Sequence, residues 1–538
     1  MNGDYIPVLS AAQMKLCDCY TIEKLNIPSQ TLMERAAASA VDVLIADRRF
    51  DTRRVLILTG GGNNGGDGIA MARLLHGKEI YANVCFVGTV TSDGFPDKVK
   101  TSVECMRQYG LAVAEGVGFI SKADLFASID TYTCIVDAIF GIGLSRDIKG
   151  EIFDVILLVN GCDKPILSVD VPSGIDADSG RICGIAVRAD VTVCIQALKS
   201  GLLRFPAVEY AGDIRVCDIG VDLSPVCQKE QMRMLGKEHL PEFFRRGRQS
   251  NKGSFGRVLF ICGSRGMSGA AYLSTSAALR CGIGLAHVFT HEDNRVIIQS
   301  QLPEAILTTY NGEACASNLA LDPAMTSADV VVIGCGLGKD KCAFALLERV
   351  LNFGGEKPLV LDADALNILS ENPQLWLTKR FADNGRHVTV ITPHPAEFAR
   401  LTGISVREIL RDMPYHARKF AKEHGVFVLL KDAHTVIVSP YGECYINPHG
   451  NSGMAKGGSG DVLAGIIGAM LADVAFDTEA SDSDVVRRIS AAVLLHSLAG
   501  EAARAELGEV SMLPSDVISA ISRVTRDFFD TTTKIEFN

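Results

Sequence analysis

The sequence predicts an α/β protein of two domains, each built around a largely parallel β-sheet. Short apolar runs rich in β-branched residues alternate with segments of helical periodicity along most of the chain. Some runs, such as residues 53–59, are nearly all apolar, as expected of strands covered on both faces. A chain of 538 residues is too long for one core. The polar stretch 225–250 is the expected linker, between a first domain at 1–224 and a second at 251–530.

The expected strands are spaced so that a helix fits between most neighbours. In the first domain they lie at 54–58, 82–87, 134–137, 166–170 and 191–195, and in the second at 258–262, 285–290, 330–334, 359–362, 388–392 and 426–431. In an open parallel sheet the carboxyl ends of the strands gather at one edge, where ligands bind. The loops that follow these strands are therefore the candidate functional sites.

Charge and cysteine content exclude several classes of function. With 53 Lys and Arg against 63 Asp and Glu, the net charge is −10, which argues against nucleic-acid binding. Arg245, Arg246 and Arg248 form a local basic cluster, which is typical of a solvated face or linker. The 16 cysteines include no CxxC pair, which indicates mostly buried thiols in a reducing compartment. We find neither a secretory signal nor a membrane-spanning apolar run, so we expect a cytoplasmic protein without membrane contact.

A glycine-rich loop, GGGNNGGDG at 60–68, joins the first strand of the first domain to a helix. Free backbone N–H groups and the positive end of the helix dipole favour an anion there. The acid that usually holds a ribose at the end of the second strand is missing, since Phe86–Thr89 stands there. The loop therefore predicts phosphate binding rather than hydride transfer. The alternative is a tight turn without a ligand.

Two further loops of the first domain carry oxygen-bearing side chains. Asp137 and Ser173 follow later strands, and Asn64 lies in the glycine-rich loop. Together these three residues offer oxygen ligands suited to a hard cation. Each alone is compatible with a satisfied loop acid or a helix cap, but their joint placement at strand ends favours the ligand interpretation.

The loops GGGNNGGDG, DAIFGIG, VDVPSGID and QALKSG resemble those of the NAD(P)H-hydrate epimerase family, in order, across residues 10–220. The resemblance implies a Rossmann-like three-layer domain and a potassium ion on Asn64, Asp137 and Ser173. It further implies substrate contacts from two segments: Asn63, Asn64, Gly65, Gly66 and Asp67, and Gly141, Ile142, Gly143, Leu144, Ser145, Arg146 and Asp147. Asp170 would lie near the nicotinamide ring as a catalytic acid or base. Lys199 falls where the family also carries lysine, and we include it among the catalytic residues. A cap of the Pro172–Ser173 turn is an equally good interpretation of Asp170.

The second domain has its best candidate site at NSGMAKGGSGD, residues 451–461, followed by an apolar helix. The amides of Gly457–Gly460 would hold a phosphoryl group while Asp461 takes a proton from a substrate hydroxyl. Asp461 as a simple helix cap is the alternative. The loop contains more glycine than a cap requires, which favours the catalytic interpretation.

This motif resembles the catalytic loop of ribokinase-fold kinases. GSRGMSGAA, LRCGIG, GCGLG, DADALN and TPHPAE narrow the resemblance to the NAD(P)H-hydrate dehydratase family, over residues 240–525. It implies a ribokinase-like α/β domain in which Ala270, Gly336, His394 and Asp461 contact the hydrate. Nucleotide contacts would come from Lys431, Asp432, Ala433, His434, Thr435 and Gly460. The implied mechanism is phosphorylation of the hydrate hydroxyl by ADP, or by ATP, followed by elimination of phosphate.

Several points stay open in the sequence. Mg²⁺ is expected with the nucleotide, and Asp362 and Asp364 are candidate ligands, but for Asp364 a helix N-cap is the preferred prediction. Asp432 and Asn251 depart from the family pattern, which usually has glycine and histidine there. The predicted function is repair of hydrated NADH and NADPH by a homo-oligomer that binds only small molecules. The alternative is a ribokinase-fold kinase of a vitamin alcohol with a non-catalytic N-terminal binding module.

Overall fold

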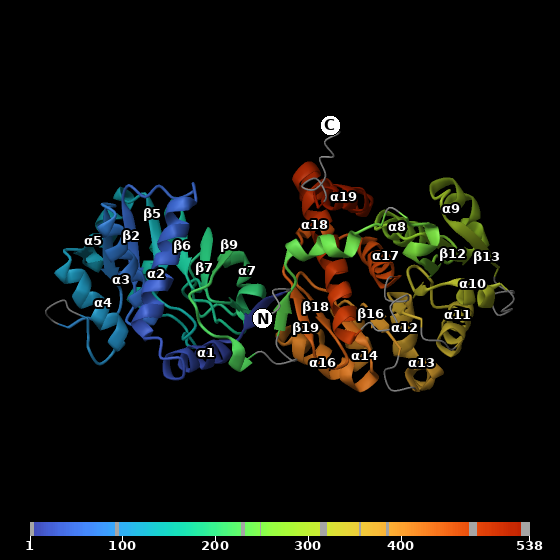
Figure 1. Ribbon diagram of the computed structural model, residues 1–538, viewed down its shortest axis with the longest axis horizontal. Helices are drawn as coiled ribbons and strands as arrows, with labels where there is room; N and C mark the ends of the chain where they lie inside the picture. Colours follow the sequence, from blue (N-terminus) through green and yellow to red (C-terminus); the bar gives the residue numbers. More distant parts are fainter. Residues whose placement is uncertain are drawn as a thin grey trace. The chain divides into compact units, whose positions relative to one another are not determined.

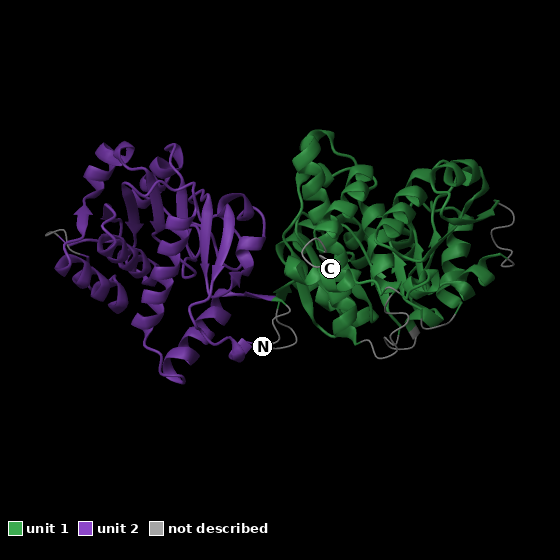
Figure 2. Ribbon diagram, turned by 45° about the horizontal axis from the view of Figure 1, so that its top comes forward, with its two compact units in different colours: residues 1–5, 232–538 green, residues 6–231 purple. Residues whose placement is uncertain are grey.

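A computed structural model of the chain describes residues 5–91, 96–226, 232–247, 249–311, 320–353, 357–382, 387–472 and 481–528. The chain divides into two compact units (Figure 2). The N-terminal unit comprises residues 6–231, and the C-terminal unit comprises residues 1–5 and 232–538. Arg248 of the basic cluster lies outside the described residues.

Parts of the expected linker at 225–250 have regular secondary structure. Within it, β10 (Met232–Met234) pairs in parallel with β19 (Cys444–Asn447), and Lys237–Phe244 forms a 3₁₀-helix. Tyr5 also belongs to the C-terminal unit, where the guanidinium of Arg233 lies 4.2 Å from the centre of its ring. The strand has only three residues and lies in a polar stretch, so composition did not reveal it.

The N-terminal unit contains a parallel sheet in the order β4-β3-β2-β5-β6-β7-β9. Its strands are β2 (Val55–Thr59), β3 (Ala82–Phe86), β4 (Gly118–Ile120), β5 (Cys134–Ala138), β6 (Ile166–Val169), β7 (Val191–Ile195) and β9 (Asp213–Cys217). All five strands predicted in this half are confirmed to within a residue at each end. A separate short pair joins β1 (Ile6–Leu9) to β8 (Leu198–Lys199), with Leu9 opposite Lys199.

Helices cover both faces of this sheet, which confirms the predicted three-layer architecture (Figure 1). Val55 and Ile57 of β2 pack with one set of helices, while Leu56 and Leu58 between them pack with another. The first set is α1 (Ala11–Glu23), α2 (Ser29–Ala46), α3 (Asn63–Gly77) and α4 (Val103–Ala114), and the second is α5 (Lys122–Ser128) and α6 (Glu151–Gly161). The alternation follows from the two-residue period of a strand. A short helix, α7 (Val208–Ala211), precedes β9.

The C-terminal unit contains a mixed sheet in the order β13-β12-β11-β14-β15-β16-β17-β18-β19-β10. Its strands from β11 to β19 are β11 (Arg257–Ile261), β12 (Leu285–His291), β13 (Ile306–Tyr310), β14 (Val330–Ile333), β15 (Leu359–Leu361), β16 (Thr389–Ile391), β17 (Phe427–Leu430), β18 (Thr435–Val438) and β19. Neighbours from β13 to β17 are parallel, whereas β17, β18 and β19 form antiparallel pairs. The six strands predicted in this half are confirmed, with ends that differ by up to one residue.

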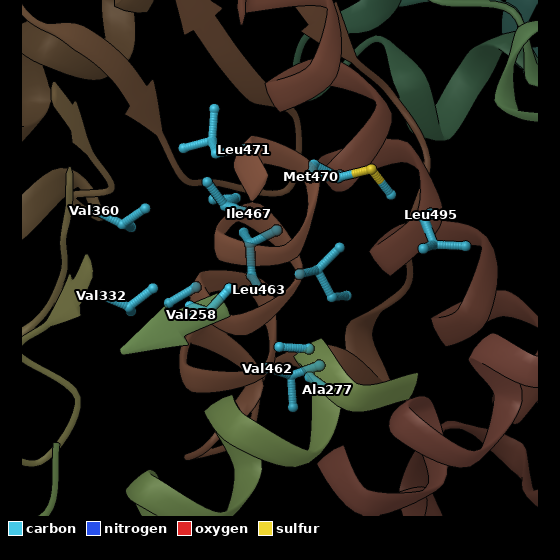
Figure 3. Close-up of a cluster of buried hydrophobic side chains, with 14 of the residues drawn as sticks. Val258, Ala277, Val332, Val360, Val462, Leu463, Ile467, Met470, Leu471 and Leu495 are labelled. Atoms are coloured by element: carbon cyan, nitrogen blue, oxygen red, sulfur yellow. The ribbon is translucent and has the colours of Figure 1, made fainter. Parts of the chain in front are cut away.

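The core of the C-terminal unit centres on α17 (Ser459–Ala472), which follows the predicted catalytic loop. Leu463 and Ile467 of α17 lie toward strand residues Val258, Val332 and Val360, whereas Val462 lies beside Ala277 of α8 (Ser268–Arg280) (Figure 3). Around α17 lie α8, α18 (Asp482–Ser511) and α19 (Pro514–Asp527). A buried helix fixes the loop at its own N-terminus, so the core positions the candidate site.

The other helices of this unit are shorter than α17 and α18. They are α9 (Arg295–Gln301), α10 (Leu321–Ser327), α11 (Lys341–Asn352), α12 (Asp364–Glu371), α13 (Lys379–Ala382), α14 (Pro395–Thr402), α15 (Val406–Arg411) and α16 (Met413–His424). Within the described ranges, no helix is both long enough and apolar enough to cross a membrane. The described cysteines carry free thiols, and most of them are buried.

Candidate functional sites

The glycine-rich loop of the N-terminal unit leads from β2 directly into α3. Gly62 is the N-cap and no side chain caps the helix, which leaves backbone N–H groups at the helix N-terminus available. A Cβ on Gly65 would lie 1.9 Å from the carbonyl oxygen of Gly60, and one on Gly60 would lie 2.2 Å from that of Ile139. The tight turn alone therefore explains two of the glycines. The tight turn does not explain why the polar side chain of Asn64 is buried in the same loop.

Asn64 is buried, and neither its amide nitrogen nor its amide oxygen has a hydrogen-bond partner. Leaving a buried polar group unpaired costs about 1–3 kcal/mol. A Cβ on Gly141 would lie 3.3 Å from both Cβ of Asn64 and Oδ2 of Asp170, so the loop after β5 approaches both residues. An unsatisfied buried amide beside a second loop indicates a place for a ligand.

Asp137, at the end of β5, is fully buried and accepts several hydrogen bonds. Ser173 donates to it from its backbone N–H (2.8 Å) and from its hydroxyl (2.5 Å), and the Ser168 hydroxyl donates at 2.8 Å. Burial raises the pKa of Asp137, although these hydrogen bonds oppose the shift. The structure thus brings together Asp137 and Ser173, two of the three predicted cation ligands.

Asp170 forms a buried ion pair with Lys199. The Nζ of Lys199 lies 2.5 Å from Oδ1 of Asp170 and 2.6 Å from the carbonyl oxygen of Ile195. Burial disfavours the charged form of Lys199, but the Asp170 carboxylate outweighs this and raises its pKa. Asp170 has a φ of 69°, a strained conformation for a non-glycine residue that is common at functional sites. Oδ1 is held by the lysine, while Oδ2 faces Gly141.

Two more carboxyls belong to this cluster. Burial raises the pKa of Asp67 well above its ordinary value, and the charges of Asp170 and Asp18 add to the effect. Burial also raises the pKa of Asp18 to about 6, opposed by the charge of Lys199 and reinforced by that of Asp170. Asp18 was not predicted. It lies on α1, without a glycine-rich loop to mark it, and reaches the cluster because β1 pairs with the strand that carries Lys199.

The second predicted substrate segment, residues 141–147, forms a loop that is largely exposed. Gly141 lies at its inner end beside Asp170, as described above. At its outer end Asp147 accepts a hydrogen bond of 2.8 Å from Arg181, and both side chains are about half exposed. The segment therefore runs from the carboxyl cluster to the surface, a placement that suits contacts along an extended ligand.

In the C-terminal unit, Asp461 lies in the first turn of α17 beside Asp362 and Cys335. Ligand atoms of these three residues lie within 4.8 Å of one another. Burial raises the pKa of Asp461 to about 6, and the charge of Asp362 adds to the shift. The place of Asp461 in the first turn of a helix also fits a cap, but a partly buried carboxyl with a perturbed pKa is more typical of a functional group.

Lys431 follows β17 and lies in the turn of the hairpin that continues into β18. Its Nζ lies 2.8 Å from Oδ1 of Asp362, which also accepts a hydrogen bond of 2.5 Å from Thr392. Burial opposes the charge of Lys431, but the Asp362 carboxylate raises its pKa. A Cβ on Gly460 would lie 3.4 Å from this Nζ. The hairpin turn and the glycine-rich loop therefore meet at Asp362 and Asp461.

The remaining predicted nucleotide and hydrate residues divide into buried and exposed groups. Within the hairpin turn His434 and Thr435 are buried, whereas Asp432 and Ala433 are exposed, so the departure at Asp432 places a charge at the surface. A Cβ on Gly336, whose φ is 58°, would lie 2.8 Å from Cβ of Ala270. The structure thus brings Gly336 and Ala270 together.

His394 caps α14 through Nδ1, which accepts from the backbone N–H groups of Ala396 (3.1 Å) and Glu397 (3.3 Å). Burial and the charge of Lys431 lower its pKa, so the ring is neutral at pH 7. The N-cap prediction for Asp364 is wrong, because Ala363 is the N-cap and Asp364 opens α12. Oδ2 of Asp364 instead accepts a hydrogen bond of 2.8 Å from Gly338 N–H.

Two protein families match this chain, one in each unit. Residues 29–201 match the family described as YjeF-related protein N-terminus, and residues 258–523 match the NAD(P)H-hydrate dehydratase family. A bifunctional NAD(P)H-hydrate repair enzyme from Moorella thermoacetica is 34% identical over 540 residues, which cover 97% of this chain and 97% of the relative. The chain belongs to the family of bifunctional NAD(P)H-hydrate repair enzymes. The predicted epimerase and dehydratase domains are therefore both present.

Another repair enzyme, from Escherichia coli, is 34% identical over 502 residues, 93% of this chain and 90% of the relative. Among solved structures, the ADP/ATP-dependent NAD(P)H-hydrate dehydratase from Bacillus subtilis, co-crystallised with ATP/Mg²⁺, is 30% identical. It covers 55% of this chain and 98% of its own, with a TM-score of 0.47. Relatives match this repair enzyme across both units, so a vitamin-alcohol kinase with an unrelated binding module is not favoured. The family matches and the parallel and mostly parallel sheets of the two units confirm the predicted Rossmann-like and ribokinase-like classes.

Proposed function

We propose that each unit of this repair enzyme carries one of its two activities, at the residues predicted from sequence. The N-terminal unit interconverts the R and S epimers of hydrated NADH and NADPH, and the C-terminal unit dehydrates the S epimer at the expense of ADP. The observation that carries the proposal is the meeting of Asp461, Asp362 and Lys431 at the glycine-rich loop. This arrangement puts a proton acceptor and a fixed positive charge where a phosphoryl group can be held.

In the C-terminal unit, Asp461 accepts the proton of the hydrate hydroxyl as that oxygen attacks the terminal phosphorus of ADP. AMP leaves, and the phosphorylated hydrate then loses inorganic phosphate to restore the dihydronicotinamide ring. With a pKa near 6, Asp461 is mostly ionised at pH 7 and still close enough to neutrality to act as a base. Amides of Gly457–Gly460 hold the transferring group, and Lys431 fixes Asp362 beside it.

Asp362 and Asp461 also fit a magnesium ion, because their oxygens are the donors that Mg²⁺ prefers. Bound with the nucleotide, the ion neutralises phosphate charge. Sγ of Cys335 completes the cluster in space but is a soft donor and does not suit Mg²⁺. ADP is the proposed donor, and ATP is the second candidate.

In the N-terminal unit, Asp170 moves the proton. Lys199 donates to Oδ1 of Asp170 and fixes the orientation of the carboxylate. The other oxygen, Oδ2, lies near Gly141, where the predicted substrate segment begins. Burial raises the pKa of Asp67 and so favours its protonated form, which suits it to return a proton when Asp170 has taken one. One carboxyl that accepts and one that donates are what inversion at a hydroxylated carbon requires.

We place a potassium ion at Asn64, Asp137 and Ser173. The residues fit, because the Asn64 amide oxygen is buried without a partner and the Asp137 carboxylate supplies charge. Bound there, the ion would add positive charge beside an anionic substrate. Cytoplasmic location and assembly into a homo-oligomer stay predictions from sequence.

The test uses the purified full chain and epimerically pure hydrates. S-NADPH hydrate is supplied with ADP and then with ATP, and the return of reduced-nicotinamide absorbance is followed, with Asp461→Asn in parallel. Recovery that needs a nucleotide and is lost in the variant supports the dehydratase assignment. R-hydrate with ADP then tests the first unit, where Asp170→Asn should reduce recovery to the spontaneous rate of epimerisation. No recovery with either nucleotide would overturn the proposal.

A further inference from the structure

One buried side chain of the C-terminal unit has no role in the mechanism above. His496 lies on α18 with 7% of its surface exposed, and its Nε2 has no hydrogen-bond partner. Burial, with a smaller contribution from the charge of Lys431, lowers its pKa to about 4, so the ring is neutral. A buried polar nitrogen without a partner destabilises a fold unless a ligand satisfies it.

His496 lies on the part of α18 that connects the two segments proposed for the nucleotide. Its neighbour Ser497 accepts a hydrogen bond of 2.9 Å from Asn447, and Asn447 lies opposite Thr435 in the β18–β19 pair. One helical turn after His496, Gly500 packs on Met454, since a Cβ there would lie 2.3 Å from the methionine sulfur. This stretch of α18 therefore faces both the hairpin that carries Lys431 and the loop that leads to Asp461.

The same loop holds a second unsatisfied group. Oδ1 of Asn451 accepts a hydrogen bond of 3.0 Å from Gly453 N–H and caps the short helix that follows, whereas Nδ2 is buried without a partner. The loop is thus held through the oxygen of the amide while its nitrogen remains available as a donor. Two buried, neutral hydrogen-bonding groups therefore occur on adjoining elements.

These groups match a purine base better than a phosphate. Phosphate oxygens prefer cations and backbone N–H groups, which Lys431 and Gly457–Gly460 already supply. An adenine edge offers an amino donor and ring-nitrogen acceptors, which neutral imidazole and amide groups can pair with. We propose that Nε2 of His496 accepts a hydrogen bond from the 6-amino group of adenine and that Nδ2 of Asn451 donates to a ring nitrogen. The inference rests on the proposed nucleotide site at Lys431–Thr435 and Gly460.

The test compares ADP with IDP, which has a carbonyl in place of the 6-amino group. His496→Leu in the full chain should raise the KM for ADP about tenfold, the loss expected for one buried hydrogen bond. It should change the KM for IDP by less than about twofold, because IDP cannot make that bond. KM for the S-hydrate and kcat should stay within about twofold of wild type. Asn451→Asp, which keeps the capping oxygen, should also weaken ADP binding.

Control variants separate a contact with the nucleotide from a structural role. His416, on α16, also has a buried ring nitrogen without a partner, and His416→Leu should leave both KM values unchanged. Without nucleotide, His496→Leu should unfold at the wild-type temperature or above it, while the stabilisation by ADP shrinks. An equal loss for ADP and IDP, or a variant that is merely less stable, overturns the inference. Failure of the wild-type enzyme to use any nucleotide would instead overturn the proposed function.

Discussion

The ion pair of the N-terminal unit allows a quantitative test, because Lys199 and Asp170 are both largely buried. Lys199 is 1% exposed and Asp170 13%, and Nζ donates to the Asp170 carboxylate and to the Ile195 carbonyl oxygen. Lys199→Met keeps the bulk of the side chain and removes its charge. Breaking a buried pair from one side leaves an uncompensated charge and costs about 3–5 kcal/mol. We expect the N-terminal unit to lose about that free energy of unfolding.

With a urea m-value of about 2.5 kcal/mol/M, a loss of about 4 kcal/mol lowers the midpoint of unfolding by roughly 1.5 M. Hydrogen exchange in urea, read on peptides of β7 and α3, reports the N-terminal unit. Trp376 is the only tryptophan of the chain and lies in the C-terminal unit, so its fluorescence reports the other unit in the same samples. The tryptophan transition should stay in place while the N-terminal midpoint falls.

A double variant distinguishes charge from packing. Lys199→Met with Asp170→Leu removes both charges, and much of the lost stability should return, since a buried pair can be replaced by apolar residues at small cost. A single variant that loses less than about 1 kcal/mol would refute the argument. So would a double variant that is no more stable than the single one.

The dehydratase rate of the wild-type enzyme should rise with pH through about 6, because burial raises the pKa of Asp461 and only its ionised form accepts a proton; a rate independent of pH between 5 and 7 would contradict this. Asn64→Leu should not lower the thermal stability of the potassium-free enzyme, because the Asn64 amide makes no hydrogen bond. In calorimetry with added potassium, the wild-type N-terminal unit should be stabilised and that of the variant should not. Gly65→Ala should destabilise the N-terminal unit by about 2 kcal/mol or more in urea unfolding, because the added Cβ would overlap the Gly60 carbonyl oxygen. The control Gly77→Ala lies in the same helix, where the added Cβ would meet no atom within 4 Å, and should have little effect.

Buried strands were the most predictable part of the fold. A parallel strand covered on both faces is a run of apolar residues, so the central strands of both units stood out in the sequence. Strand β9 was missed because its residues are largely exposed and include Asp213 and Arg215. β10 was missed because Met232–Met234 is short and lies in a polar stretch. In both cases backbone pairing rather than side-chain burial makes the strand.

The candidate sites were predictable where glycine-rich loops follow strands, because backbone geometry leaves a mark in the sequence. Asn64 and Asp461 were selected in this way, Asp137 because it ends a strand, and Asp170 through the family resemblance. Asp18 and His496 lie inside helices, where an ionisable or polar residue has the same spacing whether it faces a site or the solvent. Only the fold shows that these helices bring them to the clusters.

The two units use lysine differently, and the difference is consistent with their proposed chemistry. In the N-terminal unit Lys199 contacts Asp170, the residue that would move the proton, and thereby fixes one of its oxygens. In the C-terminal unit Lys431 contacts Asp362 rather than Asp461, and the charge of Asp362 helps to raise the pKa of Asp461. A base that works beside a transferring phosphoryl group benefits from a pKa near neutrality. A residue that must return to the same state after each inversion benefits from a fixed orientation. We therefore expect both reactions to be impaired if the lysine of the N-terminal unit contacted a neighbouring carboxyl and that of the C-terminal unit contacted Asp461 itself.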